Sequence, residues 1–283
     1  MPRTKKNVEV VENEIITTEK KIVKPSNKIL QVEDFIPGLY RMHIRVHFFD
    51  TILGTSPQDP NVYKEFLLKK NPELTQEQID AELEMLANAV EFREGLLESP
   101  EVDAATKEFE KHTTIFLRHA DGTPCTAGHQ WKGFYKEKIQ ALNFMLAKKI
   151  SAFKKKVDLC FFIEPDFPAI ITQEKMDIFQ RPLRTSGPQG ERVALSSSEQ
   201  IYPGAYCEFD TIYTHQEFAP LIRQCLDYAL LSGTAQWRSA GHGRFMWEEL
   251  DDEGNQIGGT YNPEFFKRKM DMAMACSRSG GKG

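Results

Sequence analysis

The sequence predicts an α+β fold, because segments with alternating apolar residues are interleaved with segments whose apolar residues recur every three or four positions. The chain has 283 residues, 40% hydrophobic and 27% charged, which is enough material for a sizeable core. No apolar run approaches the ~20 residues that cross a bilayer, and the N-terminus lacks the apolar stretch of a signal peptide. Five scattered cysteines without C-x-x-C spacing favour a reducing compartment. We therefore expect a cytoplasmic protein with no membrane segment, metal site or cofactor.

The N-terminal part of the chain is predicted to contain a tail, a strand and a helical insertion. Residues 1–30 show no clear period and are predicted to be a disordered tail, followed by a single domain over residues 31–255. Leu39 to Phe48 alternates apolar and polar residues, which is typical of a half-buried strand, and it runs into a turn at Gly54–Pro57. Thr75 to Gln78 forms a capping box that predicts a helix within an insertion at about residues 71–111. This insertion carries more net negative charge than the whole chain does, so the remaining residues are together mildly basic.

Five further elements complete the predicted order. A helix opens near Gly128, an apolar strand covers Leu159–Ile163, and a projecting turn-rich loop covers about residues 180–199. A strand at Ala205–Tyr213, a helix at Phe218–Leu231 and a strand at Arg244–Leu250 follow; residues 256–283 form a C-terminal helix and a flexible Gly/Ser tail. Without insertions the order is strand, helix, strand, strand, helix, strand. That is the βαββαβ order of a ferredoxin-like (RRM-like) core.

The segment Gly233–Phe245, here called the Gly/Arg loop, reads GTAQWRSAGHGRF. Its glycines permit close backbone approach, loops of this kind form concavities for anions, and arginine recognises phosphate in a bidentate manner. Arg238 and Arg244 are the predicted phosphate ligands, although Arg244 could equally brace the loop. Trp237 either stacks on a base or covers the core. The predicted site is completed by Ser239, Gly241 and Gly243.

A second basic feature follows Gly128. Lys132 and Lys136 lie one turn apart near the start of a predicted helix, where orphan N–H groups and the helix dipole favour phosphate. The alternative is an ordinary solvated basic face. The predicted projecting loop contains three arginines among glycine and proline residues, namely Arg181, Arg184 and Arg192. This composition suits a flexible loop that binds phosphate.

Four segments in order resemble the RAMP superfamily of CRISPR-associated proteins, most closely the backbone subunits that polymerise along guide RNA. Gln236–Phe245 resembles the family's glycine-rich loop, Gly128–Lys136 its helix opening, Ile201–Phe209 its entry into a strand, and the first strand with Ile52–Thr55 its first strand and turn. The chain departs from the pattern at Thr234 and Ala235, where a glycine pair is common. It also departs at His129-Gln130, where serines are common.

The resemblance implies a protein that holds single-stranded nucleic acid, with RNA favoured over DNA, mainly through phosphate contacts. It implies self-association or assembly with other complex subunits, in a bacterial cell or a phage-infected host. The chain is also similar to uncharacterised phage and prophage proteins. Two other functions stay open. One is a metal-independent endoribonuclease that uses His129 or His242 for acid–base chemistry. The other is a phage structural or anti-defence interaction protein. Asp59 loosely matches an acidic residue of target-cleaving subunits.

Overall fold

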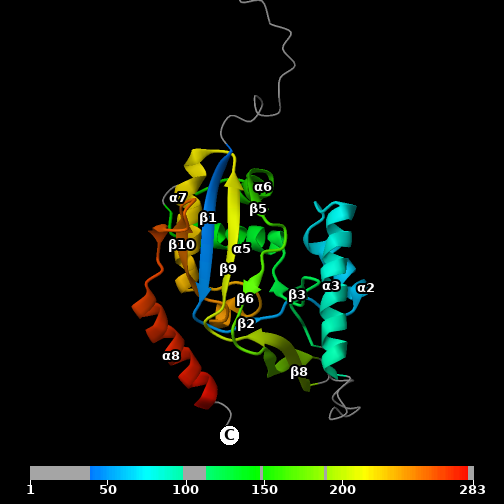
Figure 1. Ribbon diagram of the computed structural model, residues 1–283. Helices are drawn as coiled ribbons and strands as arrows, with labels where there is room; N and C mark the ends of the chain where they lie inside the picture. Colours follow the sequence, from blue (N-terminus) through cyan, green and yellow to red (C-terminus); the bar gives the residue numbers. More distant parts are fainter. Residues whose placement is uncertain (1–38, 98–112, 147–148, 188–189, 280–283) are drawn as a thin grey trace, which may run out of the picture. The chain divides into compact units, whose positions relative to one another are not determined.

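The central sheet is built around the first predicted strand, which a computed structural model of the protein places at Tyr40–Phe48 (β1). The structure describes residues 39–97, 113–146, 149–187 and 190–279 (Figure 1). The predicted N-terminal tail therefore lies outside the described residues. β1 pairs with β9 (Tyr206–Tyr213) on one side and with β10 (Phe245–Leu250) on the other. The outer strands are β5 (Phe161–Glu164) and β6 (Ile170–Ile171), both beside β9, and β11 (Gln256–Gly259) beside β10. All these pairings are antiparallel, so the fold is α+β, as predicted.

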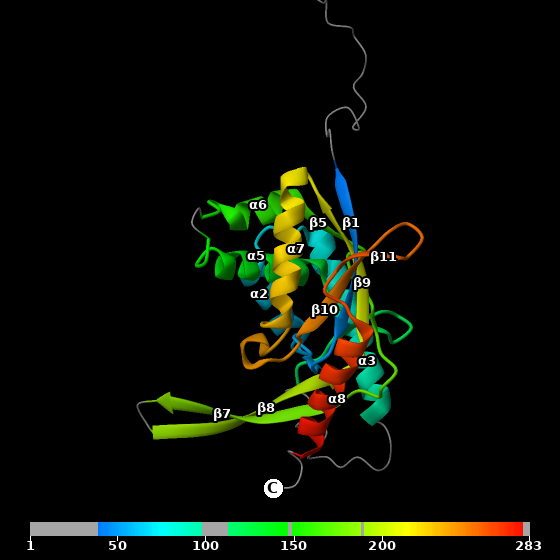
Figure 2. The same cartoon turned by 90° about the vertical axis from the view of Figure 1, so that its left-hand side faces the viewer.

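One face of this sheet forms the main core. The inward residues of β1 are at most 1% exposed, and they are Met42, Ile44, Val46 and Phe48. Helices α5 (Gly128–Leu142) and α7 (Ala219–Asp227) cover this face (Figure 2). The ring of Trp131 on α5 lies 4.2 Å from that of Phe209 on β9. Burial of such side chains stabilises the fold by about 1.5–3 kcal/mol each.

The opposite face of the sheet carries paired charges. Arg41, His43, Arg45 and His47 alternate with the core residues of β1, as the period of two requires. Arg45 contacts Glu208 on β9 at 2.5 Å and Glu248 on β10 at 3.0 Å. The predicted C-terminal segment 256–283 opens with strand β11, and helix α8 (Pro263–Ser279) follows it; the ring of Phe266 on α8 lies 5.7 Å from that of His47. The basic side chains on this face are therefore paired with carboxylates, and the face is not a free basic surface.

The predicted acidic insertion contains helix α3 (Gln76–Leu97), and helix α2 (Pro60–Lys70) lies just before it in the chain. The predicted capping box is confirmed, because the Thr75 N–H donates to Oε1 of Gln78 at 3.0 Å and the Gln78 N–H donates to Oγ1 of Thr75 at 3.3 Å. Ile79 and Leu86 of α3 lie in a second, smaller core. Two short paired strands, β3 (Leu117–Arg118) and β4 (Pro124–Cys125), belong to the same region. Residues 98–111 of the predicted insertion lie outside the described residues.

The predicted projecting loop is instead a long β-hairpin. Strands β7 (Asp177–Gly187) and β8 (Gly190–Ile201) pair in continuous register, and the end of β8 pairs with β2 (Ile52–Leu53). Figure 2 shows the hairpin running out past the helices that cover the sheet. The glycine and proline content indicated a loop, but the two strands satisfy each other's backbone groups along their length.

The predicted strand at Leu159–Ile163 is wrong in its first two residues. Leu159 and Cys160 are the last residues of helix α6 (Phe153–Cys160), and β5 begins directly at Phe161. Leu159 is accordingly 62% exposed, whereas Phe161 is buried. A short apolar run does not distinguish a helix end from a strand by periodicity alone.

Candidate functional site

The Gly/Arg loop is held by a close crossing of its own two ends. The Thr234 N–H donates to the Gly243 carbonyl at 3.0 Å, and the Gly243 N–H donates to the Thr51 carbonyl at 2.9 Å. A Cβ at Gly233 would lie 2.2 Å from the Gly243 carbonyl carbon. Gly243 itself has φ +67°, and a Cβ there would lie 2.3 Å from the Thr234 carbonyl oxygen. These two glycines are therefore required by backbone contact.

A buried lysine supports the loop from below. The Lys138 ammonium group donates to Ser232 Oγ and to the Gly233 carbonyl, both at 2.9 Å, and pairs with Glu137 at 3.0 Å. Burial lowers the pKa of Lys138, and the neighbouring Glu137 carboxylate opposes that shift. The sequence analysis missed this residue, since a lysine on an amphipathic helix is normally solvent-exposed.

Arg238 is the exposed cation of the loop. It pairs with the other carboxylate oxygen of Glu137 and donates to the Ala235 carbonyl at 3.1 Å, yet 48% of its side chain is exposed. Ser239 lies beside it in an exposed 3₁₀ turn, Arg238–Ala240. Gly241 ends that turn with φ +95°. This short segment presents one arginine, one hydroxyl group and several backbone groups to solvent.

Arg244 braces the loop, which is the alternative left open by the sequence. Its Nε donates to Asp50 at 2.5 Å and to the Gly241 carbonyl at 3.2 Å. Its guanidinium carbon lies 5.5 Å from the centre of the Phe49 ring. These partners tie the loop to the end of β1, so the role of Arg244 is first structural.

The base of the hairpin packs on the loop. The Arg181 guanidinium lies against the Trp237 ring, and Phe179 contacts Trp237 edge to face at 6.3 Å. His242 lies 5.2 Å from Phe179 in the same cluster, and burial lowers the pKa of His242. Trp237 thus stacks with a cation from the hairpin instead of lying in the main core.

Arg184 and Arg192 lie farther along the hairpin, where Arg184 is opposite Val193 and Arg192 is opposite Thr185. Their side chains lie outside the described residues. Among the hairpin arginines whose side chains the structure describes, Arg181 contacts the Gly/Arg loop.

The two predicted helix lysines face a different neighbour. Lys136 pairs with Asp158 of α6 and lies 3.8 Å from Glu73. Lys132 donates to the Asp158 carbonyl at 3.4 Å, and burial lowers its pKa. Both ammonium groups turn towards α6, so Lys132 and Lys136 form a feature separate from the Gly/Arg loop.

The two remaining catalytic candidates have clear structural partners. Asp59 is the N-cap of α2 and accepts hydrogen bonds from the Asn61 and Val62 N–H groups at 2.8 and 3.3 Å. His129 Nδ1 lies 2.8 Å from Glu82 Oε1, and the Tyr63 hydroxyl donates to the other oxygen of Glu82 at 2.8 Å. Asp59 is thus assigned to helix capping.

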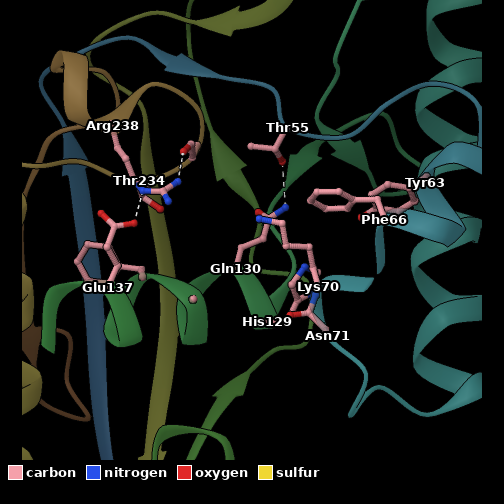
Figure 3. A pocket seen from close by; sticks show the side chains of 13 residues that line it. Thr55, Tyr63, Phe66, Lys70, Asn71, His129, Gln130, Glu137, Thr234 and Arg238 are labelled. Carbon is pink, nitrogen blue, oxygen red and sulfur yellow. Dashed lines mark hydrogen bonds and ion pairs between the residues drawn. The ribbon is translucent and has the colours of Figure 1, made fainter. Parts of the chain in front are cut away.

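A cavity of about 210 Å³ lies between α2, α5 and the Gly/Arg loop. Figure 3 shows Tyr63, Phe66 and Lys70 on one side of it, and Glu137 and Arg238 on the other. The sequence analysis missed the α2 residues because it did not predict this helix. The signal was present: Asp59-Pro60 combines a favoured N-cap residue with proline in the first helical turn.

No protein-family model matches the chain, and a search of curated proteins finds no match either.

The described residues contain no group of three or more His, Cys, Asp or Glu side chains placed to hold a metal ion. Within the same residues, no helix is long and apolar enough to cross a membrane.

Proposed function

We propose that the protein is a RAMP-type nucleic-acid-binding protein that holds single-stranded RNA or DNA through phosphate contacts. The observation that carries the proposal is the junction of the Gly/Arg loop with the hairpin. There, Arg181 and Trp237 form a cation–aromatic stack, and Arg238 is exposed beside a cavity. A cationic group, an aromatic ring and exposed backbone at one place are the components that bind single strands without strong sequence preference.

The proposed core is ferredoxin-like. The strand order β10-β1-β9-β5 supports this core, and all of its pairings are antiparallel. In chain order, α5 lies between β1 and β5, and α7 lies between β9 and β10. This strand order supports the split βαβ arrangement that the element order predicts. RRM domains bind RNA on the open face of such a sheet. Here that face carries paired charges, so we assign binding to the loop and hairpin instead.

Arg238 is the proposed principal phosphate ligand, and it must exchange its carboxylate partner for the phosphate. An exposed ion pair is worth at most about 1 kcal/mol, so a phosphate group can displace Glu137. Glu137 keeps the buried Lys138 as a partner after the exchange. The carboxylate is therefore not left without a counter-charge.

The test measures binding of labelled single-stranded RNA and DNA by fluorescence anisotropy over a series of salt concentrations. We expect affinity to fall steeply with salt, and Arg238→Ala to weaken binding and reduce the magnitude of the log–log salt slope by about 0.7. Arg223→Ala is the matched control, because Arg223 is likewise about half exposed (45%) and paired with one glutamate. Absence of binding by the wild-type protein at low salt would overturn the proposal.

A metal-independent endoribonuclease is the second candidate, and the His129–Glu82 pair favours it. A carboxylate 2.8 Å from an imidazole beside a cavity is an arrangement suited to general acid–base chemistry. Discrete RNA products formed in the presence of EDTA, and lost in His129→Gln, would support this function. Intact RNA recovered from the same incubation supports the binding protein.

Self-association along the strand is part of the proposal. A head-to-tail interface between identical subunits generates an open filament when its rotation does not close. Light scattering with and without a long single strand should show a strand-dependent increase in mass.

A further inference from the structure

We infer that the cavity between α2 and the Gly/Arg loop receives one unstacked nucleobase of the bound strand. This inference rests on the proposed function and names the ligand group that the site takes. At about 210 Å³ the cavity is smaller than the ~300–1,000 Å³ clefts that hold drug-sized molecules, so it suits a single planar group.

The wall on α2 supplies an aromatic platform. Phe66 exposes 38% of its surface and lies nearly parallel to the buried Tyr63 ring, with 6.3 Å between centroids and 15° between planes. Lys70 places its ammonium group 5.8 Å from the Phe66 centroid, at the edge of the cavity. Aromatic rings stack on bases of every kind, and an ammonium group beside the ring attracts the phosphate that follows the base.

The floor of the cavity includes a glycine that packing does not require. Gly133 lies within α5, and a Cβ built on it meets no atom within 4 Å. Glycine destabilises a helix interior relative to alanine, and no neighbouring backbone demands it here. By contrast, Gly233 and Gly243 are required by close contact. The missing side chain at Gly133 keeps the cavity open.

Polar groups around the cavity match the edge of a base. The Gln130 carboxamide is held by a 3.0 Å hydrogen bond from its Nε2 to Thr55 Oγ1, and Asn71 lies on the same lining (Figure 3). Carboxamides offer both donors and acceptors, as base edges do. On the far wall, Arg238 can contact the phosphate of the same nucleotide or of its neighbour.

The experiment compares a labelled single-stranded oligonucleotide with an abasic strand of the same length, so that both carry the same phosphates. We expect the wild-type protein to bind the strand with bases more tightly. Gly133→Leu, which fills the cavity, should lower affinity for that strand about 5- to 100-fold, while binding of the abasic strand is unchanged. Phe66→Ala removes the platform at an exposed position and should have the same selective effect.

Gly95→Leu is the matched control. Gly95 is also a helical glycine with nothing within 4 Å of its built Cβ, and it does not line this cavity. If Gly133→Leu and Phe66→Ala, both folded by circular dichroism, keep the wild-type preference for bases, the cavity is not a base site although strand binding stands. If the wild-type protein binds neither strand, the proposed function fails together with this inference.

Discussion

Single residues decide whether the Gly/Arg loop can close. Ala235 and Trp237 have φ +62° and +57°, so two non-glycine residues occupy the left-handed region inside one loop. That conformation costs energy for residues with a Cβ, and the surrounding hydrogen bonds must offset it. Lys138 supplies two of these bonds from beneath the loop. The loop is thus held by its supports more than by its own conformational preferences.

Gly243, where the ends of the loop cross, should be highly sensitive to a single added methyl group. Gly243→Ala forces a positive φ on alanine and also places Cβ 2.3 Å from the Thr234 carbonyl oxygen. We expect it to destabilise the protein by about 2–4 kcal/mol in thermal or urea unfolding.

Gly254→Ala is the control for that substitution, because Gly254 has φ +82° with nothing within 4 Å of its built Cβ. It should cost only about 1 kcal/mol. Equal losses in the two variants would show that backbone conformation alone, and not the crossing of the loop ends, sets the requirement for glycine.

At the scale of elements, the hairpin and the loop meet through several contacts, among them the Arg181–Trp237 stack. Arg181 comes from β7 and Trp237 from the loop between α7 and β10. Trp131 and Trp247 are each 1% exposed, whereas Trp237 is only partly buried. Trp237 therefore dominates the response of tryptophan fluorescence to a soluble quencher.

Arg181→Ala should uncover the Trp237 ring. We expect greater acrylamide quenching of the intrinsic fluorescence than in the wild-type protein, because the guanidinium no longer shields one side of the indole. The increase should vanish when Arg181→Ala is made in a Trp237→Phe background. Unchanged quenching in the single variant would mean that Arg181 does not cover the Trp237 ring.

At the scale of the whole molecule, the sheet has one apolar face and one face of paired charges that includes the partly buried His47. His47 is enclosed by the Tyr261 ring at 3.8 Å and by Glu248 at 2.8 Å. Burial lowers the pKa of His47 below its usual 6.5, although the carboxylate of Glu248 favours the charged form. His242 in the loop is shifted in the same direction by the same cause.

The sign of the pH dependence follows from that shift. In the unfolded chain His47 takes up a proton near pH 6.5, whereas in the folded protein it stays neutral at that pH. The contribution of the neutral imidazole to the free energy of unfolding is therefore fully present above pH 6.5. It is lost as pH falls below 6.5 towards the folded-state pKa. We expect the melting temperature to decrease from pH 7 to pH 5.5, and less steeply in His47→Gln.

His215→Gln, at an exposed histidine between β9 and α7, serves as the control for this pH series. It should leave the wild-type pH slope in place. A slope equally reduced by both substitutions would contradict the role of burial at His47.

Local patterns predicted the core strands β1, β5, β9 and β10 and the helices α3, α5, α7 and α8, because each depends on neighbours along the chain. The alternation at β1 and the capping box before α3 are examples. The long hairpin was not predicted, since its backbone groups are satisfied by a partner strand whose pairing cannot be read from glycine and proline content. Helix α2 was missed although Asp59-Pro60 marks its start.

The sequence by itself determined the α+β character and the glycine-dependent loop, because periodicity and the conformational freedom of glycine are local properties. Only the tertiary structure decided which predicted cations are available. Lys132 and Lys136 turn to Asp158, Arg244 is tied to Asp50, and Arg238 is paired yet half exposed. The physical reason is that an arginine or lysine binds whichever carboxylate the fold brings nearest, and those partners lie far away in the sequence.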